Sequence, residues 1–308
     1  MEGYPEKQGL YDPQYEHDSC GIGAIAHIKG KRTHKTIKDA LNILIHLEHR
    51  GGTGVEDAEE FSAFEAKIIE APYGQAACKI GELAGNMVVF LSRHGVTHNV
   101  APHKVNYRAN IWALKSLGVE EIFATTAVGS LNKDMGVGHF VVCSDILDFT
   151  KSRIGTFYDT PERGVVHCDF THPYCEECRT KVIACLEKLG ITYHKTGTYV
   201  CTEGPRFETA AEIKMYAMLG GDVIGMTNIP EAYLAREAEM CYTTCSIVTN
   251  MGAGIIDTPI DHMEVIAKMK ESVDKMRQVI VEYIKYDQPI KVKCGCHEAI
   301  KAFGGFKL

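Results

Sequence analysis

The chain has 308 residues, of which 45% are hydrophobic and 24% charged, so it can bury a substantial core, and one large domain with a short appendage is expected. Its net charge of −7 and the lack of an arginine-rich run argue against a nucleic-acid partner. It has no run of the ~20 apolar residues that a membrane span needs, and charged and polar residues follow Met1 where a signal peptide would begin, so we expect a cytoplasmic protein with no membrane partner.

The first fifty residues differ from the rest. They contain Glu16-His-Asp-Ser-Cys20-Gly-Ile-Gly and, further on, His46-Leu-Glu-His-Arg50-Gly. Both runs resemble the start of the glutamate synthase large subunit, a class II glutamine amidotransferase. The resemblance implies that Cys20 matches a nucleophile exposed by removal of a short propeptide, but it stops near Arg50, before the rest of the glutamine pocket. We expect residues 1–50 to be a truncated, non-catalytic appendage and residues 51–308 to form the main domain.

Short apolar runs alternate with helical patterns from Asn86 onward. The runs predict strands at 87–91, 122–126, 139–143, 199–202, 222–226 and 242–248. Three- and four-residue apolar spacing predicts helices at 104–117, 177–189, 209–219, 230–238 and 261–286. This alternation predicts an α/β fold with a largely buried β-sheet flanked by helices. Side chains that follow the carboxyl ends of the strands should meet where open α/β sheets bind ligands.

Two polar residues follow two of these strands, at the ends of Cys201-Thr-Glu-Gly-Pro-Arg-Phe-Glu208 and Cys245-Ser-Ile-Val-Thr-Asn250. An Asn amide can donate to O6 of a 6-oxopurine and accept from a protonated N7, while a carboxylate accepts from N1–H. Adenine inverts this pattern and would leave buried polar groups unpaired, at about 1–3 kcal/mol each. Glu208 and Asn250 therefore predict a site for a 6-oxopurine, with both residues on turns that leave the strands.

Four sequence blocks carry a second resemblance. They are Leu91-Ser-Arg93-His94-Gly95 with His98, Val105-Asn-Tyr107-Arg-Ala-Asn110-Ile-Trp112, Thr202-Glu-Gly-Pro-Arg-Phe207, and Gly225-Met226-Thr227-Asn-Ile-Pro230-Glu231. In this order they resemble the methylthioadenosine phosphorylase branch of the trimeric purine nucleoside phosphorylases, from about Gly51 to the C-terminus. Adenine-cleaving members carry Asp-x-Asp where this chain has Asn250-Met251-Gly252, and they lack a glutamate at the place of Glu208. The resemblance thus implies a member of the 6-oxopurine type, with one domain around a central mixed sheet, assembled as a homotrimer.

The resemblance also assigns roles to individual residues. Phosphate, the co-substrate, would be bound by Thr53 in the Gly51-Gly-Thr53-Gly54 loop, Arg93, His94, Thr126, Ala127 and Thr227. Phe207 would stack on the base and Met226 would pack under the ribose. Asn250 would stabilise the proton developing at N7 in a transition state that resembles an oxocarbenium ion. Asn250, Glu208 and His94 are the predicted catalytic residues, and no covalent intermediate, metal or cofactor is expected.

These assignments predict phosphorolysis of inosine and guanosine to the free base and ribose 1-phosphate, in purine salvage. Cleavage of 5′-methylthioinosine or 5′-methylthioadenosine is the alternative. His262 matches a histidine that meets the 5′-hydroxyl in ordinary nucleoside phosphorylases, whereas methylthio-specific relatives prefer an apolar residue there. A solvent-exposed histidine at a helix start also fits His262.

A second alternative is an inactive remnant with a disabled phosphate loop. In the family an apolar strand precedes the Gly-Gly-Thr-Gly loop, but here residues 39–50 have helical spacing. Either residues 42–47 supply that strand or the loop with Thr53 is poorly anchored.

Most of the twelve cysteines, including Cys143, Cys201, Cys241 and Cys245, lie in apolar strand patterns, where a free thiol acts as a small hydrophobe in a reducing compartment. Cys175-Glu-Glu-Cys178 has the spacing of half a zinc site, but no partner pair follows at the usual spacing, so a helix start is expected in place of a metal site. Cys294-Gly-Cys296 resembles a feature of some family members. A strained disulfide and two free thiols both fit it, and a cytosolic location favours the thiols.

Overall fold

The computed structural model describes residues 22–25, 64–95, 100–256 and 262–308. Its strands are β1 (Ile22–Ile25), β2 (Glu65–Ala71), β3 (Gly74–Leu83), β4 (Asn86–Leu91), β5 (Glu121–Ser130), β6 (Phe140–Val142), β7 (Asp145–Phe149), β8 (Tyr193–His194), β9 (Thr198–Thr202), β10 (Val223–Gly225) and β11 (Cys241–Met251). The α-helices are α2 (Tyr107–Ser116), α3 (Glu176–Lys188), α4 (Ala210–Met218), α5 (Asn228–Glu237) and α6 (His262–Ile284). Short 3-10 turns, η4 (Pro102–Lys104), η5 (Cys296–Glu298) and η6 (Lys301–Phe303), complete the described elements.

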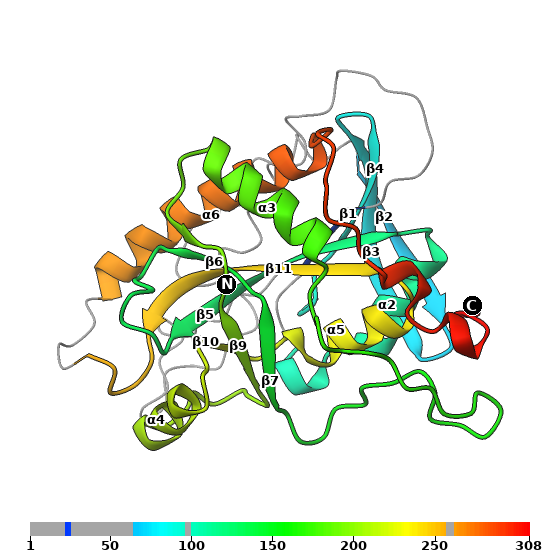
Figure 1. Ribbon diagram of the computed structural model, residues 1–308, viewed down its shortest axis with the longest axis horizontal. Coiled ribbons are helices and arrows are strands. Elements are labelled where there is room, and N and C mark those ends of the chain that lie inside the picture. Colours follow the sequence, from blue (N-terminus) through cyan, green and yellow to red (C-terminus); the bar gives the residue numbers. More distant parts are fainter. Residues whose placement is uncertain (1–21, 26–63, 96–99, 257–261) are drawn as a thin grey trace, which may run out of the picture.

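All strands belong to one mixed sheet that branches at β5. Its main path runs β2-β3-β4-β1-β5-β10-β9-β7, while β11 pairs with β5 and β6, and β6 pairs with β8. β11 runs parallel to β5, and β9 runs parallel to β10 and β7. β1 is antiparallel to both β4 and β5, and β10 is antiparallel to β5. The prediction of a central mixed sheet flanked by helices is confirmed, and β5 and β11 form its buried centre (Figure 1).

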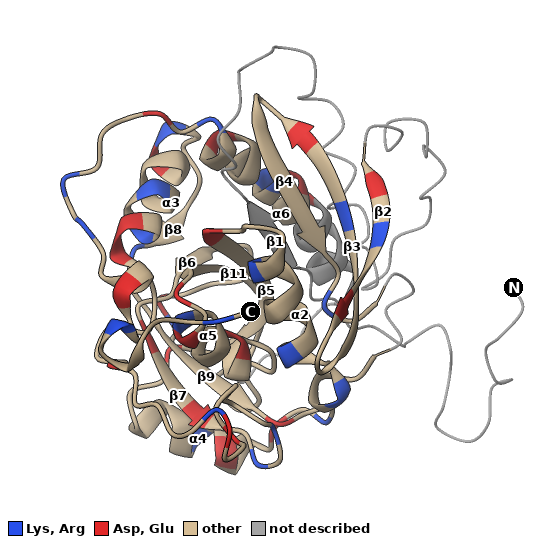
Figure 2. Cartoon of the chain, turned by 90° about the vertical axis from the view of Figure 1, so that its right-hand side faces the viewer, with Lys and Arg blue, Asp and Glu red and all other residues tan. Residues whose placement is uncertain are grey.

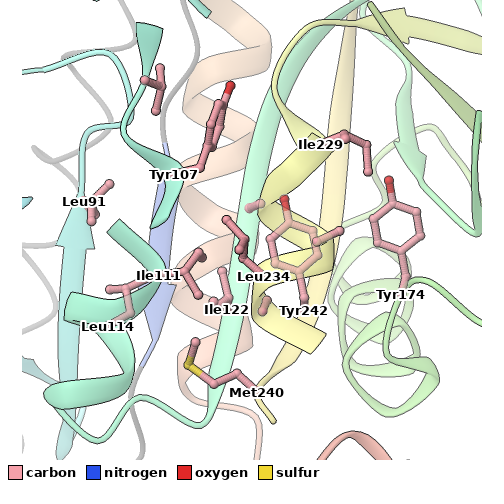
Figure 3. Close-up of a cluster of buried hydrophobic side chains, with 14 of the residues drawn as sticks. Leu91, Tyr107, Ile111, Leu114, Ile122, Tyr174, Ile229, Leu234, Met240 and Tyr242 are labelled. Atoms are coloured by element: carbon pink, nitrogen blue, oxygen red, sulfur yellow. The ribbon is translucent and has the colours of Figure 1, made fainter. Parts of the chain in front are cut away.

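Alternate residues of the central strands enter two different hydrophobic clusters, as the two-residue period of a strand requires. Ile122 and Tyr242 belong to the cluster shared with α2 and α5 (Figure 3), whereas Phe123 and Cys241 belong to the cluster shared with α3 and α6. In Figure 1 these helix pairs accordingly cover opposite sides of β5 and β11. Burial on both sides explains why neither strand shows a simple alternation of apolar and polar residues.

The position between β4 and β5 is filled by β1, which comes from the amidotransferase-like segment. Ile22 pairs with Leu91 of β4 and with Ala124 of β5, and the antiparallel register continues to Ile25 on both sides. The alternative sequence prediction, a strand at residues 42–47, lies outside the described residues, as does the loop with Thr53. Ile22–Ile25 therefore links the two halves of the sheet.

The predicted strands and helices from Asn86 onward are confirmed, with ends that shift by a few residues. The sequence analysis missed the β2–β3 hairpin and the strands β7 and β8. β2 is largely exposed, with Ile68 at 65% exposure, so it lacks the apolar pattern that marks a buried strand. β7 reads Asp-Ile-Leu-Asp-Phe and carries two carboxylates within five residues.

Among the described helices, none is both long and apolar enough to cross a membrane. On the face drawn in Figure 2, basic and acidic residues are interspersed over the helices and strands.

Candidate functional site

The turns that follow β9 and β10 leave the sheet side by side, because the two strands are parallel and pair Cys201 with Gly225. The first turn carries Glu208, whose Oε1 accepts a 2.6 Å hydrogen bond from Thr202 Oγ1 at the end of β9. The second begins at Met226. Glu208 is thus held against the sheet by its own strand, in a half-buried position.

Gly204 lets these two turns approach each other. Its φ is +66°, and a Cβ built there would lie 2.5 Å from Met226 Sδ. Any other residue would be strained and would clash with the methionine. The Thr-Glu-Gly-Pro turn and Met226 are therefore packed together.

Arg153 forms hydrogen bonds with the main chain of both turns, and its side chain is 2% exposed. Nη2 donates to the carbonyl oxygens of Thr202 (3.1 Å) and Glu203 (2.8 Å). Nη1 donates to those of Met226 (2.6 Å) and Ile229 (2.5 Å). The sequence analysis missed this residue, because a lone arginine in a loop carries no pattern and its acceptors are main-chain atoms far along the chain.

The turn with Phe207 and Glu208 is also fixed at its far end. Thr209 caps α4 in a capping box with Glu212, and Arg206 donates two hydrogen bonds to the Glu212 carboxylate (2.8 and 2.7 Å). Phe207 itself is 63% exposed, so it does not belong to the hydrophobic core.

Asn250 lies inside β11, which corrects the expectation that it sits on a turn after the strand. The register between β11 and β5 shifts by a bulge between Val248 and Asn250, and Asn250 then pairs with Gly129. Thr249 Oγ1 donates to Asn250 Oδ1 (2.8 Å), and Asn250 Nδ2 donates to Met251 O (3.0 Å). These bonds use one of the two amide hydrogens and orient the side chain.

Thr126 and Ala127 also lie inside a strand, β5, which continues through Gly129 to Ser130. β5 thus extends past residue 126, where the sequence analysis ended the predicted strand. Thr126 Oγ1 shares a 2.8 Å hydrogen bond with Ser246 Oγ of β11, and Ala127 pairs with Ile247. The predicted contact of Thr126 with phosphate and ribose stays a prediction.

Arg93 forms a buried, two-pronged ion pair with Glu231, with Nε–Oε2 at 2.8 Å and Nη2–Oε1 at 2.9 Å. Both side chains are 0% exposed, and Tyr242 donates a further hydrogen bond to Glu231 Oε1 (2.9 Å). The sequence analysis matched the fork of Arg93 to phosphate oxygens, but that edge of the guanidinium faces Glu231. Glu231, which the sequence analysis assigned no role, thus fixes the orientation of Arg93.

His94 and Thr227, which follow β4 and β10, are also buried, at 4% and 0% exposure. His94 Nδ1 donates to Val100 O (2.6 Å), which sets the tautomer, so Nε2 can donate to an anion only when the ring is protonated. Within the described residues, Thr227 Oγ1 is buried without a hydrogen-bond partner. A buried hydroxyl of this kind needs an explanation, and a bound ligand is one.

Three residues named in the sequence analysis cannot be placed with the others. Thr53 lies outside the described residues, as does His98. His262 is the first residue of α6, but its side chain is not among those described.

Comparison with known proteins connects this geometry to a family. The sequence profile of the phosphorylase superfamily matches residues 51–285, and the profile of the class-II glutamine amidotransferases matches residues 20–63. Both resemblances found in the sequence are thereby confirmed.

Individual relatives cover most of the chain. The 6-oxopurine nucleoside phosphorylase of Pyrococcus furiosus is 49% identical over 260 residues, 83% of this chain and 97% of the relative. A protein of Methanocaldococcus jannaschii named "Probable S-methyl-5'-thioinosine phosphorylase" is 48% identical over 251 residues, 82% of this chain and 96% of the relative.

Solved structures of methylthioadenosine phosphorylases share the fold. One from an antarctic soil metagenomic library has a TM-score of 0.73 at 36% identity and covers 78% of this chain and 85% of its own. The enzyme from Schistosoma mansoni in complex with tubercidin has a TM-score of 0.68 at 31% identity, covering 73% of this chain and 85% of its own.

Proposed function

This chain belongs to the phosphorylase superfamily, and on that premise we propose that it cleaves the N-glycosidic bond of 6-oxopurine nucleosides with inorganic phosphate. Inosine and guanosine are the substrates, and the products are the free base and ribose 1-phosphate. Relatives named 6-oxopurine nucleoside phosphorylase at 49% identity support this choice.

The choice of a 6-oxopurine base rests on the hydrogen-bond donors and acceptors that Asn250 and Glu208 offer. The Asn250 amide keeps a second N–H for O6 after its bond to Met251 O, and a carboxylate such as Glu208 accepts from N1–H. Thr202 fixes one Glu208 oxygen, which leaves the other oxygen for the base in this scheme. Adenine would present a lone pair to the carboxylate and lose about 1–3 kcal/mol per unpaired group.

Phosphate is proposed to lie on the other side of the sugar, near Thr227 and His94. The buried Thr227 hydroxyl supports this placement, since it needs a partner that the described residues do not supply. His94 would donate to phosphate in its protonated form, because Nδ1 is engaged by Val100 O. The oxocarbenium-like sugar then lies between an anionic phosphate and a departing purine whose N7 proton Asn250 stabilises.

The neighbouring function is cleavage of 5′-methylthioinosine. It uses the same base pattern and differs only at the 5′ group, and the Methanocaldococcus jannaschii relative carries that name. His262 is the residue proposed to favour a 5′-hydroxyl. An inactive phosphate loop would leave a purine-binding protein without turnover.

The test is phosphate-dependent base release from inosine, guanosine, 5′-methylthioinosine and 5′-methylthioadenosine, measured side by side. Release from the 6-oxopurine nucleosides alone supports the proposal, and the ratio of inosine to methylthioinosine decides the 5′ group. Preferred release from methylthioadenosine would contradict the assigned roles of Glu208 and Asn250. Binding of hypoxanthine without any turnover would indicate the inactive remnant.

We further propose a cytoplasmic homotrimer that acts in purine salvage. The family resemblance supports the trimer, and the composition and the many free cysteines support the cytoplasm. The mass in solution, measured by light scattering, tests the trimer directly.

A further inference from the structure

Four cysteines that the proposed reaction does not use meet at one point of the fold. Cys175 caps the start of α3, Cys241 is the first residue of β11, and Cys294 and Cys296 lie in the C-terminal segment. Their four Sγ atoms all lie within 4.8 Å of one another. In Figure 1 the C-terminal segment, drawn in red, passes the start of β11 to reach this point.

We propose that Cys175, Cys241, Cys294 and Cys296 bind one zinc ion as a tetrahedral tetrathiolate site. The inference is independent of the substrate of the enzyme. With Zn–S bonds of about 2.3 Å, the sulfurs of such a site are separated by about 3.8 Å. Cys241 Sγ and Cys294 Sγ are 3.4 Å apart, whereas a disulfide needs about 2.05 Å. All eleven described cysteines are free thiols.

The surroundings suit a structural ion. Cys175, Cys241 and Cys296 are 2%, 3% and 3% exposed, while Cys294 is half-buried, so its side of the cluster is in contact with solvent. His297 donates from Nδ1 to Glu239 O (3.1 Å), and its Nε2 lies 3.5 Å from Cys241 Sγ.

The main chain fixes the ligands before any ion binds. Cys175 N donates to Tyr242 O (2.8 Å), which ties the start of α3 to the start of β11. The Glu239 carboxylate accepts from Ile300 N (3.2 Å) and Phe306 N (3.1 Å), which ties the C-terminal segment to the loop before Cys241. A preformed site of this kind loses little ordering entropy on binding.

Four soft sulfur ligands without an open position favour a structural zinc ion over a catalytic one. Binding releases four thiol protons and forms four Zn–S bonds, with no oxidant or reductant involved. Cys241 and Asn250 are nine positions apart along β11, about 30 Å at 3.3 Å per residue, so the ion cannot touch the substrate. Its effect is to hold the C-terminal segment, whose Phe306 packs on Trp112 and Phe157.

The experiment measures metal content by inductively coupled plasma mass spectrometry, on the full-length chain purified with reductant and without chelator after growth with zinc. We expect about one zinc per chain in the wild type and near zero in Cys294→Ser/Cys296→Ser. Cys185→Ser is the matched control, because Cys185 is a buried free thiol of α3 outside the cluster, and it should retain the ion. Cobalt loading of the wild type should give the intense visible bands of a tetrahedral thiolate site, which requires no variant to fold.

Two results would overturn the proposal. One is a metal-free wild type whose intact mass is lower by four hydrogens, which indicates two disulfides. The other is a metal-free wild type in which every thiol reacts with Ellman's reagent on unfolding. Bound iron in place of zinc would overturn the identity of the ion.

Discussion

Replacing Arg153 with methionine should weaken both the fold and substrate binding. Methionine fills similar space without a donor, so the carbonyl oxygens of Thr202, Glu203, Met226 and Ile229 lose their shared partner. Each hydrogen bond to a charged donor is worth about 1.5–3 kcal/mol, and because all four come from one side chain we expect a combined loss of about 3–5 kcal/mol, less than the sum of four independent bonds. We expect the free energy of unfolding to fall by that amount.

Activity should fall as well, because the same bonds position the Glu208 turn and Met226. We expect a decrease of at least about tenfold in kcat/KM for inosine, carried mostly by KM, as misplacement of binding groups predicts. Arg153→Lys keeps the charge but not the planar fork, so it should recover only part of both losses.

The assays are urea unfolding and steady-state phosphorolysis. Arg108→Met is the matched control, because Arg108 pairs with Asp159 at 2.7 Å with side chains 19% and 34% exposed, and such pairs are worth about 0–1 kcal/mol. If Arg153→Met unfolds at the same urea concentration as Arg108→Met and keeps the wild-type KM, the positioning role is refuted.

Three further predictions concern the site itself. Asn250→Asp should lower kcat/KM for inosine by about 10- to 100-fold, since a carboxylate cannot donate to O6, and unchanged inosine kinetics would remove Asn250 from its role. Thr227→Val should raise KM for phosphate by about tenfold, because it removes the proposed contact with phosphate. Stability measured by thermal unfolding should stay equal or rise, because the replaced hydroxyl is buried and lacks a partner among the described residues. An unchanged phosphate KM would argue against the contact. Glu212→Ala should raise KM for inosine by loosening the turn with Phe207, and an unaltered KM would show that the cap is dispensable. Arg206 and the Thr209 cap lower the pKa of Glu212 from 4.5 to about 2, so this stabilisation should be complete above pH 4.5 and be lost as the pH falls through about 2, which an acid unfolding series of wild type and variant would detect.

The sequence predicted the parts of the fold whose residues repeat with a period. Buried strands such as β5 and β11 and amphipathic helices such as α6 follow from apolar spacing alone. The β2–β3 hairpin was not predicted, because its outer strand is exposed and therefore has no apolar pattern. The boundary of β11 was misjudged because a bulge extends the strand past Val248 to Met251, and no residue type marks a bulge.

The sequence nominates site residues that lie within short, recognisable blocks, but it missed residues that act through distant partners. Glu208 and Thr227 lie in such blocks at strand ends. Arg153 acts by contacts with residues 49 to 76 positions away, and Glu231 pairs with Arg93, 138 positions away; no local spacing reveals either. The same holds for Cys175, whose neighbours Cys241, Cys294 and Cys296 are close in space and remote in sequence.

The pairing of Ile22–Ile25 between β4 and β5 has a consequence for how the two family segments relate. A sheet accepts a strand through its main-chain hydrogen bonds, and these are available from any extended segment of sufficient length. A segment that resembles one family can thus supply a strand to the sheet of another family without sharing its sequence. A protein cut at the family boundary near Gly51 would lose the strand that joins β4 to β5. The structural unit of this protein therefore includes residues 22–25, although the match to the phosphorylase superfamily begins at residue 51.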